Sequence, residues 1–325
     1  MRILLFGDGE WATVSLHRLM AAGVEIIGVV MRRRPTDSAF SAAASALGVP
    51  VLRPERVNDA EFVRTVGELR PHLNLSVSYD QIIRRPLLDS APLGFVNYHA
   101  GKLPQYRGRN VINWAIINDE TEIGVTAHYV DEGIDTGDII LQRTVPIGWT
   151  DTYLDVLRNV VRVLPELVVE TVGLIRAERA PRHPQPRRGT YFSARREGDE
   201  WLDWADSSRF LYNKVRAISQ PGPGARTWLG REVVTVWRAA YDPAWPRYRA
   251  TPGEVVGGVE GEGVIVKTGD STLLVKEVQL AGGPPQSPRW PIGTRLGLDL
   301  QTVIANLQSE VDSLRQKLDV AHNVG

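Results

Sequence analysis

The sequence predicts an α/β protein, in which a Rossmann-like, mostly parallel sheet precedes a smaller OB-like β-barrel and a C-terminal helix. Short apolar runs alternate with helical patterns through the first third of the chain, which is typical of βαβ units. Gly-rich, strand-like segments with tight turns dominate the region before Leu280, which favours a small barrel. The end of the chain has heptad spacing. We therefore expect domains at residues 1–189, 190–298 and 299–325.

The first domain is expected to begin as alternating strands and helices, and open sheets of this kind bind ligands beyond the carboxyl ends of their strands. Residues 121–147 follow as two alternating runs around the turn DEGIDTGD, and residues 151–175 carry apolar residues at helical spacing. A Pro- and Arg-rich segment, Glu178–Arg188, has the composition of a linker. The expected early strands are Met1–Phe6, Val24–Met31, Val49–Leu52 and Leu73–Val77, and the expected helices are Trp11–Ala22, Ser38–Leu47 and Asp59–Leu69.

Composition excludes several classes of site. The chain has 325 residues, with 38 Lys and Arg, 38 Asp and Glu, and no cysteine. Disulfides, thiolate metal sites and cysteine nucleophiles are therefore excluded. The zero net charge argues against a protein held to nucleic acid mainly by phosphate neutralisation, although a local basic patch stays possible. No membrane-length apolar run and no signal peptide stand out, so we expect a cytoplasmic protein that does not enter a membrane.

The C-terminal tail has the pattern of an amphipathic helix with about three heptads. β-branched residues at position a with Leu at position d favour parallel dimers, and Glu310 at g is placed to meet Arg315 at e of a partner. A homodimer formed through this helix is one expectation, and a helix packed on its own chain is the alternative. The seam consists of Leu300, Ile304, Leu307, Val311, Leu314, Leu318 and Ala321.

The residues able to do chemistry concentrate between positions 94 and 140. Asn97 and His99 follow an apolar run, and residues i and i+2 of a strand project from one face. Asp135, in a loop between two strands, could bring a carboxylate to the imidazole. An amide, an imidazole and a carboxylate suit acyl transfer. A structural histidine and a solvated acidic turn are the alternatives, and His128, inside a strand, is expected to be structural.

Two segments carry a family resemblance. Residues 97–108, NYHAGKLPQYRG, and the later DEGIDTGDI resemble the folate-dependent formyltransferase family, whose signature is Asn-x-His, Leu-Pro-x-x-Arg-Gly and an Asp-Thr-Gly loop. The longer pattern most resembles the nucleotide-linked sugar N-formyltransferases. The resemblance covers about residues 1–280 and leaves the tail without a counterpart.

The resemblance implies that Asn97, His99 and Asp135 are catalytic. It also implies 10-formyltetrahydrofolate as the formyl donor, with no metal. The donor's pterin is expected near the segment SVSYDQIIRRPLLD and the Asp-Thr-Gly loop. Ordinary core packing is the alternative for the apolar residues of that segment. The expected donor-binding residues are Ile82, Ile83, Leu88 and Asp135.

The acceptor is expected to be the primary amine of a nucleotide-linked amino sugar, without nucleic acid as a partner. Within the family, an amino acid or (hydroxy)ornithine amine and methionyl-tRNA are alternatives. A formyltetrahydrofolate hydrolase and a non-catalytic oligomerising module are alternatives of other classes. Guanidinium groups bind diphosphates well, and an aromatic ring can stack on a base. The expected acceptor-binding residues are Trp11, Lys102, Arg107, Arg109 and Asn110.

Overall fold

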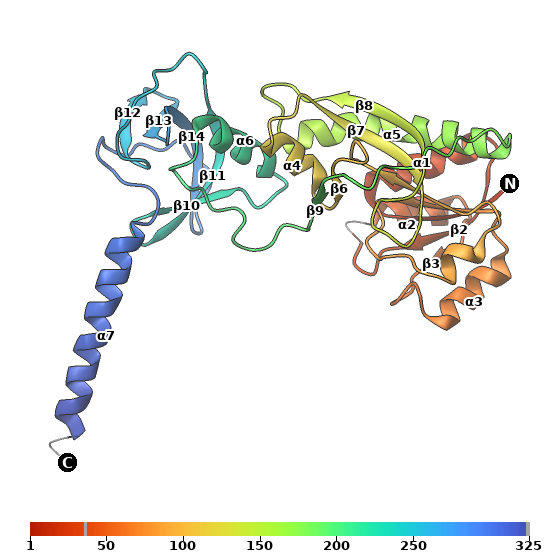
Figure 1. The fold of residues 1–325 in the computed structure, drawn as a ribbon, viewed down its shortest axis with the longest axis horizontal. Coiled ribbons are helices and arrows are strands. Elements are labelled where there is room, and N and C mark those ends of the chain that lie inside the picture. Colours follow the sequence, from red (N-terminus) through yellow and green to blue (C-terminus); the bar gives the residue numbers. More distant parts are fainter. Residues whose placement is uncertain (36–37, 323–325) are drawn as a thin grey trace. The chain divides into compact units, whose positions relative to one another are not determined.

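The computed structural model describes residues 1–35 and 38–322, which form two compact units, each with its own sheet (Figure 1). The first unit runs from Met1 to Arg196, and the second begins at Glu197. Among the helices of these described residues, none is long and apolar enough to cross a membrane.

The sheet of the first unit has, within the described residues, seven strands in the order β3-β2-β1-β4-β5-β7-β8. Neighbours from β3 to β5 run parallel, whereas β7 and β8 are antiparallel, so the predicted mostly parallel sheet is confirmed. The direction of the strand order reverses between β1 and β4, which is where open sheets hold ligands. The bounds are β1 Arg2–Gly7, β2 Glu25–Met31, β3 Val51–Leu52, β4 Leu73–Val77, β5 Phe95–His99, β7 Glu122–Tyr129 and β8 Ile139–Pro146.

The core of this unit explains why its strands are continuous apolar runs. Residues 3–6 of β1 are completely buried, as expected for parallel strands covered on both faces. On one face, the centre of the Phe6 ring lies 4.9 Å from that of Phe95 and 6.5 Å from that of Phe62 in α3. The helices α1 and α5 contact each other. Thr152 and Asp155 cap α5 reciprocally. The helices are α1 Gly9–Ala21, α2 Ala39–Ala46, α3 Ala60–Leu69, the short 3₁₀ helix η1 Leu87–Ser90, α4 Val111–Ile117 and α5 Tyr153–Arg176.

The expected linker, Glu178–Arg188, lies along the first unit. His183 and Ile139 of the edge strand β8 exchange backbone hydrogen bonds of 3.0 and 2.9 Å. Further on, β9 (Tyr191–Phe192) pairs with β6 (Arg107–Gly108). An edge strand has unpaired peptide groups, and this segment satisfies those of Ile139, which composition alone does not reveal.

The second unit contains, in its described part, a five-stranded antiparallel sheet in the order β10-β11-β14-β13-β12, followed by a helix, α7 (Leu300–His322). Beyond the last strand, Leu296 donates to Gly253 beside β12, and Gly297 donates to Trp228 in β10, both at 2.8 Å. These bonds join the two edges of the sheet, as expected for the predicted small barrel. The other bounds are β10 Ala225–Leu229, β11 Glu232–Ala240, β12 Val255–Val259, β13 Gly263–Lys267, β14 Thr272–Leu280 and the helix α6 Ser208–Ile218.

Candidate active site

A cavity of about 440 Å³ opens at the carboxyl ends of β4 and β5. This volume lies in the range of small-molecule sites, and the position is the one that a doubly wound sheet favours. Residues from β5, from β7 and from the loop before β8 line it together, and they include Asn97, His99, His128 and Asp135. The structure therefore brings the three predicted catalytic residues to one cavity.

Strand β5 places Asn97 and His99 on the same side, two residues apart, as the spacing predicts. His99 is 8% exposed. Gly101 keeps room for its ring, because a Cβ there would lie 2.5 Å from His99 Nε2 and 2.4 Å from the Tyr106 carbonyl oxygen. A side chain at this position would displace the imidazole.

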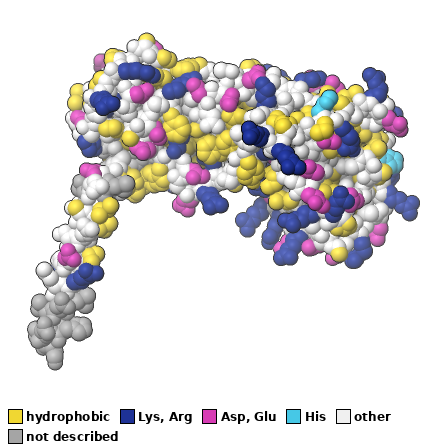
Figure 2. Space-filling model, in the orientation of Figure 1, with side chains coloured by type: hydrophobic (Ala, Val, Ile, Leu, Met, Phe, Trp, Pro, Cys, Tyr) yellow, Lys and Arg dark blue, Asp and Glu magenta, His cyan; other side chains and the backbone are white. Residues whose placement is uncertain are grey.

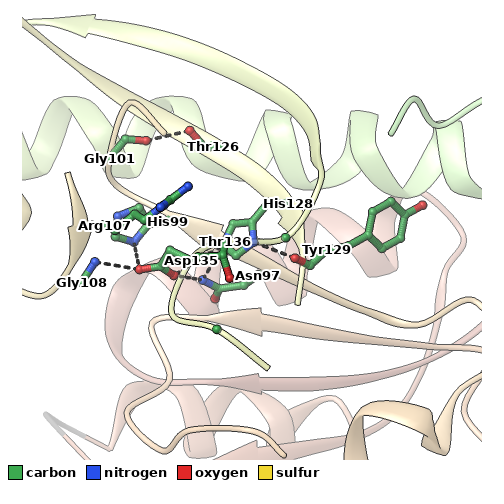
Figure 3. Close-up of polar contacts among 12 residues, drawn as sticks. Asn97, His99, Gly101, Arg107, Gly108, Thr126, His128, Tyr129, Asp135 and Thr136 are labelled. Carbon is green, nitrogen blue, oxygen red and sulfur yellow. Dashed lines mark hydrogen bonds and ion pairs between the residues drawn. The ribbon is translucent and has the colours of Figure 1, made fainter. Parts of the chain in front are cut away.

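Asp135 lies between the other polar groups of the cluster (Figure 3). Its Oδ2 accepts a 2.8 Å hydrogen bond from the Gly108 N–H and lies 3.6 Å from His99 Nδ1. Its Oδ1 lies 3.4 Å from Asn97 Nδ2 and 3.5 Å from His128 Nε2. We name Asn97, His99, His128 and Asp135 the carboxylate cluster.

Backbone carbonyls fix how the two imidazoles face Asp135. The Tyr106 carbonyl oxygen lies 2.6 Å from His99 Nε2, and the Tyr129 carbonyl oxygen lies 2.8 Å from His128 Nδ1. A carbonyl only accepts hydrogen bonds, so each of these ring nitrogens carries a proton. The opposite nitrogens, His99 Nδ1 and His128 Nε2, face the carboxylate, and a proton on either of them forms an ion pair with it.

The environment keeps Asp135 ionised. Burial on its own would raise the pKa of this carboxyl, but the charge of His99, the His128 side chain and the Gly108 N–H together outweigh burial. The pKa of Asp135 consequently lies well below its usual value of 3.8. At neutral pH the cluster therefore holds a negative charge between two groups that can carry protons.

Arg107 supports the Asp135 loop from outside the cavity. Its guanidinium donates to Gln185 Oε1 at 2.8 and 3.3 Å, and Gln185 Nε2 donates to the backbone oxygens of Asp135 and Gly137 at 3.0 and 2.7 Å. Gly137 packs closely, since a Cβ there would lie 1.8 Å from the Tyr129 carbonyl oxygen. The predicted acceptor-binding role of Arg107 therefore has no geometric support, because its side chain is used within the protein.

The expected donor-binding residues separate into two groups. Ile82 and Ile83 line the cavity. Leu88 is 8% exposed and belongs to the core cluster that contains Phe6 and Phe95, so its side chain is used in packing and not in lining the cavity. For Leu88 the structure thus favours the alternative of ordinary core packing.

The expected acceptor-binding residues also separate. Trp11, Arg109 and Asn110 line the cavity, and Arg109 Nη2 donates to the Asp80 carbonyl oxygen at 2.6 Å. Asn110 adopts a positive φ of 55° and accepts from the Arg195 N–H. Lys102 instead pairs with Glu122 and does not contribute to the described lining of the cavity.

Two residues of the site were not predicted from the sequence. His128 was expected to be structural, but it lines the cavity and faces Asp135. Its register opposite Asn97 on the neighbouring strand is the signal that could have revealed it. Gln185 lies in the presumed linker, and no local pattern points from it to Asp135. Among the described residues, no group of three or more His, Asp and Glu side chains could hold a metal ion.

Comparison with known proteins gives matches along nearly the whole chain. Residues 1–172 match the family model described as formyl transferase, and residues 196–292 match the formyl transferase C-terminal domain. The methionyl-tRNA formyltransferase of Symbiobacterium thermophilum is 41% identical, covering 87% of this chain and 89% of its own. That of Desulforamulus reducens is 35% identical, covering 87% and 91%.

Solved structures share the fold at lower identity. The N-formyltransferase from Helicobacter canadensis, in complex with folinic acid and dTDP-3-aminofucose, has a TM-score of 0.64 at 21% identity, covering 84% of this chain and 98% of its own. The methionyl-tRNA formyltransferase from Clostridium thermocellum has a TM-score of 0.55 at 16% identity, covering 75% and 95%.

These comparisons contradict the expected sugar acceptor. Relatives of 32–41% identity over most of the chain are methionyl-tRNA formyltransferases, whereas the sugar enzymes resemble it at only about 20%. The expectation that no nucleic acid binds, which rested on zero net charge, loses its support for the same reason. What the motifs, the fold and both family models agree on is the reaction class: the chain is an enzyme that belongs to the formyl transferase family.

Proposed function

We propose that the protein transfers a formyl group from 10-formyltetrahydrofolate to the α-amine of methionyl-tRNA. The observation that carries this proposal is the 41% identity to a methionyl-tRNA formyltransferase over 87% of the chain. The similarity extends into the second unit, which matches the C-terminal domain of the family. The geometry of the carboxylate cluster supports the transfer step, and the charges around the cavity support the acceptor.

The cavity fits a folate donor. Oδ1 of Asp80 is buried in the cavity wall and has no hydrogen-bond partner among the described residues. A buried oxygen of this kind needs a donor, and the N–H groups of a pterin ring supply one. Ile83 and Val130 add apolar surface for the ring. Asp80, Ile82 and Ile83 are therefore the residues that would hold the donor, whose formyl group is already activated by its attachment to nitrogen.

His99 moves the proton in this mechanism. The amine of the acceptor attacks the formyl carbon and loses a proton as the new C–N bond forms. The bond between the formyl carbon and the donor nitrogen then breaks, and tetrahydrofolate leaves with a proton on that nitrogen, so the proton count balances. His99 Nδ1 takes the amine proton directly or through a water molecule, because Nε2 is engaged with the Tyr106 carbonyl. The resulting imidazolium lies beside ionised Asp135, whose oxygen is 3.6 Å away. Asp135 therefore stabilises the charge that His99 acquires.

Asn97 and the protonated His99 stabilise the charge that develops on the formyl oxygen. The contacts of Asn97 Nδ2 to Asp135 and to His128 are long, at 3.4 and 3.2 Å. Long bonds of this kind leave the amide able to turn toward a stronger acceptor in the transition state.

Basic loops that are joined to one wall of the cavity suit a polyanionic acceptor. Arg33 pairs with Glu55, Val57 donates to Gln81, and the N–H of Arg84 donates to Asn58, so the loops that follow β2, β3 and β4 are joined. Figure 2 shows basic side chains gathered on this part of the first unit. The net charge of zero is a sum over the whole chain and does not describe this surface. Its exposed arginines are Arg33, Arg34, Arg53, Arg56, Arg84 and Arg85.

An assay of formylmethionyl-tRNA formation tests the proposal. We expect product only when donor, enzyme and charged initiator tRNA are all present, with one tetrahydrofolate released per formyl group transferred. Uncharged tRNA and free methionine are the acceptor controls. Release of formate without any acceptor would instead indicate a hydrolase. Turnover with amino sugars but not with methionyl-tRNA would contradict the proposal.

A further inference from the structure

Helix α7 presents an apolar seam that the formyl transfer reaction does not use. The four seam residues with described side chains are 45–55% exposed, and Figure 2 shows hydrophobic side chains along the described part of the helix. The family models end before this helix, at residue 292. The seam residues Leu300, Leu318 and Ala321 lie outside the described side chains. The exposed members are Ile304, Leu307, Val311 and Leu314.

The spacing of these residues is typical of a helix that pairs with another helix. Apolar residues alternate at intervals of three and four, which is the pattern of a seam between two coiled helices. A helix packed on its own domain has a broader apolar face, typically more than 100° wide. In α7 the remaining described positions from 305 to 317 are polar or small and exposed. The exposed seam and its narrow width argue against the alternative that α7 packs on its own chain.

We propose that α7 pairs with α7 of a second copy of this chain as a parallel, two-stranded coiled coil. Position a holds Ile304 and Val311, and position d holds Leu307 and Leu314, the combination that favours two parallel strands. The seam offers only about three heptads, so the dimer forms reversibly and its population depends on protein concentration.

Charges beside the seam fix the orientation. Glu310 at position g and Arg315 at position e are five residues apart, the separation that brings g of one helix to e of its parallel neighbour. Within one helix, Arg315 lies 3.8 Å from Asp312, but both side chains are about 70% exposed or more, so this pair contributes little. Two Glu310–Arg315 pairs therefore form in the parallel dimer, and an antiparallel pairing does not bring these two positions together.

The mass of the full-length protein, measured by light scattering from micromolar to hundred-micromolar concentrations, tests the association. We expect a shift from monomer to dimer that Leu307→Asp abolishes. Ser309→Asp, which adds the same charge on the outer face, leaves the shift unchanged. Both variants retain formyl transfer, since neither residue lies in the first unit. A monomer at all concentrations, or a dimer that survives Leu307→Asp, overturns the proposal.

Cysteine crosslinking tests the orientation, because the natural chain contains no cysteine. Leu307→Cys places two thiols face to face only in a parallel, in-register dimer, so it forms an intermolecular disulfide readily. Ser309→Cys points outward and crosslinks at least about tenfold more slowly, because disulfides need Cβ atoms about 4 Å apart. Equal rates for the two variants contradict the parallel arrangement.

Charge reversal tests the register. Glu310→Arg and Arg315→Glu each create two like-charge contacts, and each raises the dimer dissociation constant roughly 3- to 10-fold. The double variant Glu310→Arg, Arg315→Glu restores opposite charges and recovers most of the lost affinity. A double variant that is weaker than both single variants contradicts the proposed g-to-e pairing.

Discussion

The carboxylate cluster and the arginine-bearing loops, which are the loops that follow β2, β3 and β4, are built differently. The cluster lines the cavity, whereas the exposed arginines of these loops lie outside its described lining. Asp135 is 12% exposed and contacts groups from β5, β6 and β7, so its position depends on many long-range contacts. Arg33 and Arg34 are exposed, and Arg33 pairs with the exposed Glu55 at 2.9 Å. The first region is suited to chemistry that tolerates little displacement. The second is suited to a large acceptor that is held by charge.

Removing a reacting group of the carboxylate cluster should have the largest effect on kcat. We expect His99→Ala and Asp135→Asn to lower kcat by about 10²- to 10⁴-fold, because proton transfer or its electrostatic support is lost. Initial rates with saturating methionyl-tRNA measure this, and circular dichroism checks the fold. A near-normal rate in either variant removes that residue from the mechanism.

Removing the Arg107 side chain, which supports the Asp135 loop, should lower kcat less than removing a reacting group does. Arg107→Ala deletes the guanidinium that holds Gln185, so the Asp135 loop is less well positioned. We expect kcat to fall about 10- to 100-fold, with a small change in KM, because small displacements of catalytic groups are costly. Lys102→Ala is the matched control, since Lys102 pairs with Glu122 away from the cavity lining. Equal effects of the two variants would show that Arg107 has no special role.

Replacing arginines of the arginine-bearing loops should weaken the binding of methionyl-tRNA without affecting kcat. We expect Arg33→Ala combined with Arg34→Ala to raise KM for methionyl-tRNA about tenfold with kcat unchanged. The slope of the logarithm of tRNA affinity against the logarithm of salt concentration should become shallower by about one to two units. Arg179→Ala, an exposed arginine after α5, is the control. A fall in kcat with an unchanged salt dependence would erase the distinction between the two regions.

The smallest effect concerns stability against acid. The pKa of Asp135 is lower in the folded protein than its usual value of 3.8, so ionised Asp135 stabilises the fold above that value. This contribution is lost as the pH falls below 3.8 toward the lower folded value. The stability difference between wild type and Asp135→Asn should therefore shrink from about pH 5 downwards, as urea unfolding will measure. A difference that stays constant to pH 2 argues against ionised Asp135.

The sequence predicted the chemistry of the first unit well because that information is local. Asn97 and His99 lie two residues apart on one strand, so their common face follows from backbone geometry alone. The order of strands and helices in residues 1–77 also follows from local apolar patterns. The motif containing Asp135 could be matched to a family without knowledge of its contacts.

Other features depend on contacts distant in sequence, and reasoning from the chain missed them. His128 faces Asp135 only because β7 pairs with β5, and Gln185 reaches the Asp135 loop from fifty positions away. Arg107 was expected to bind a phosphate because a guanidinium group suits one, but its guanidinium group already donates to Gln185. The expected sugar acceptor, which rested on motif resemblance and on the zero net charge, was wrong partly for a related reason. Net charge averages over the chain and conceals the arginines on neighbouring loops.

A competition experiment tests whether the cavity transfers formyl groups to methionyl-tRNA in preference to small acceptors. One reaction mixture would contain 10-formyltetrahydrofolate, methionyl-tRNA, free methionine and a nucleotide-linked amino sugar, and mass spectrometry would quantify every formylated product. We expect formylmethionyl-tRNA as the dominant product, with a preference over both small acceptors that declines as salt is added. Dominant formylation of the amino sugar or of free methionine, at any salt concentration, would contradict it.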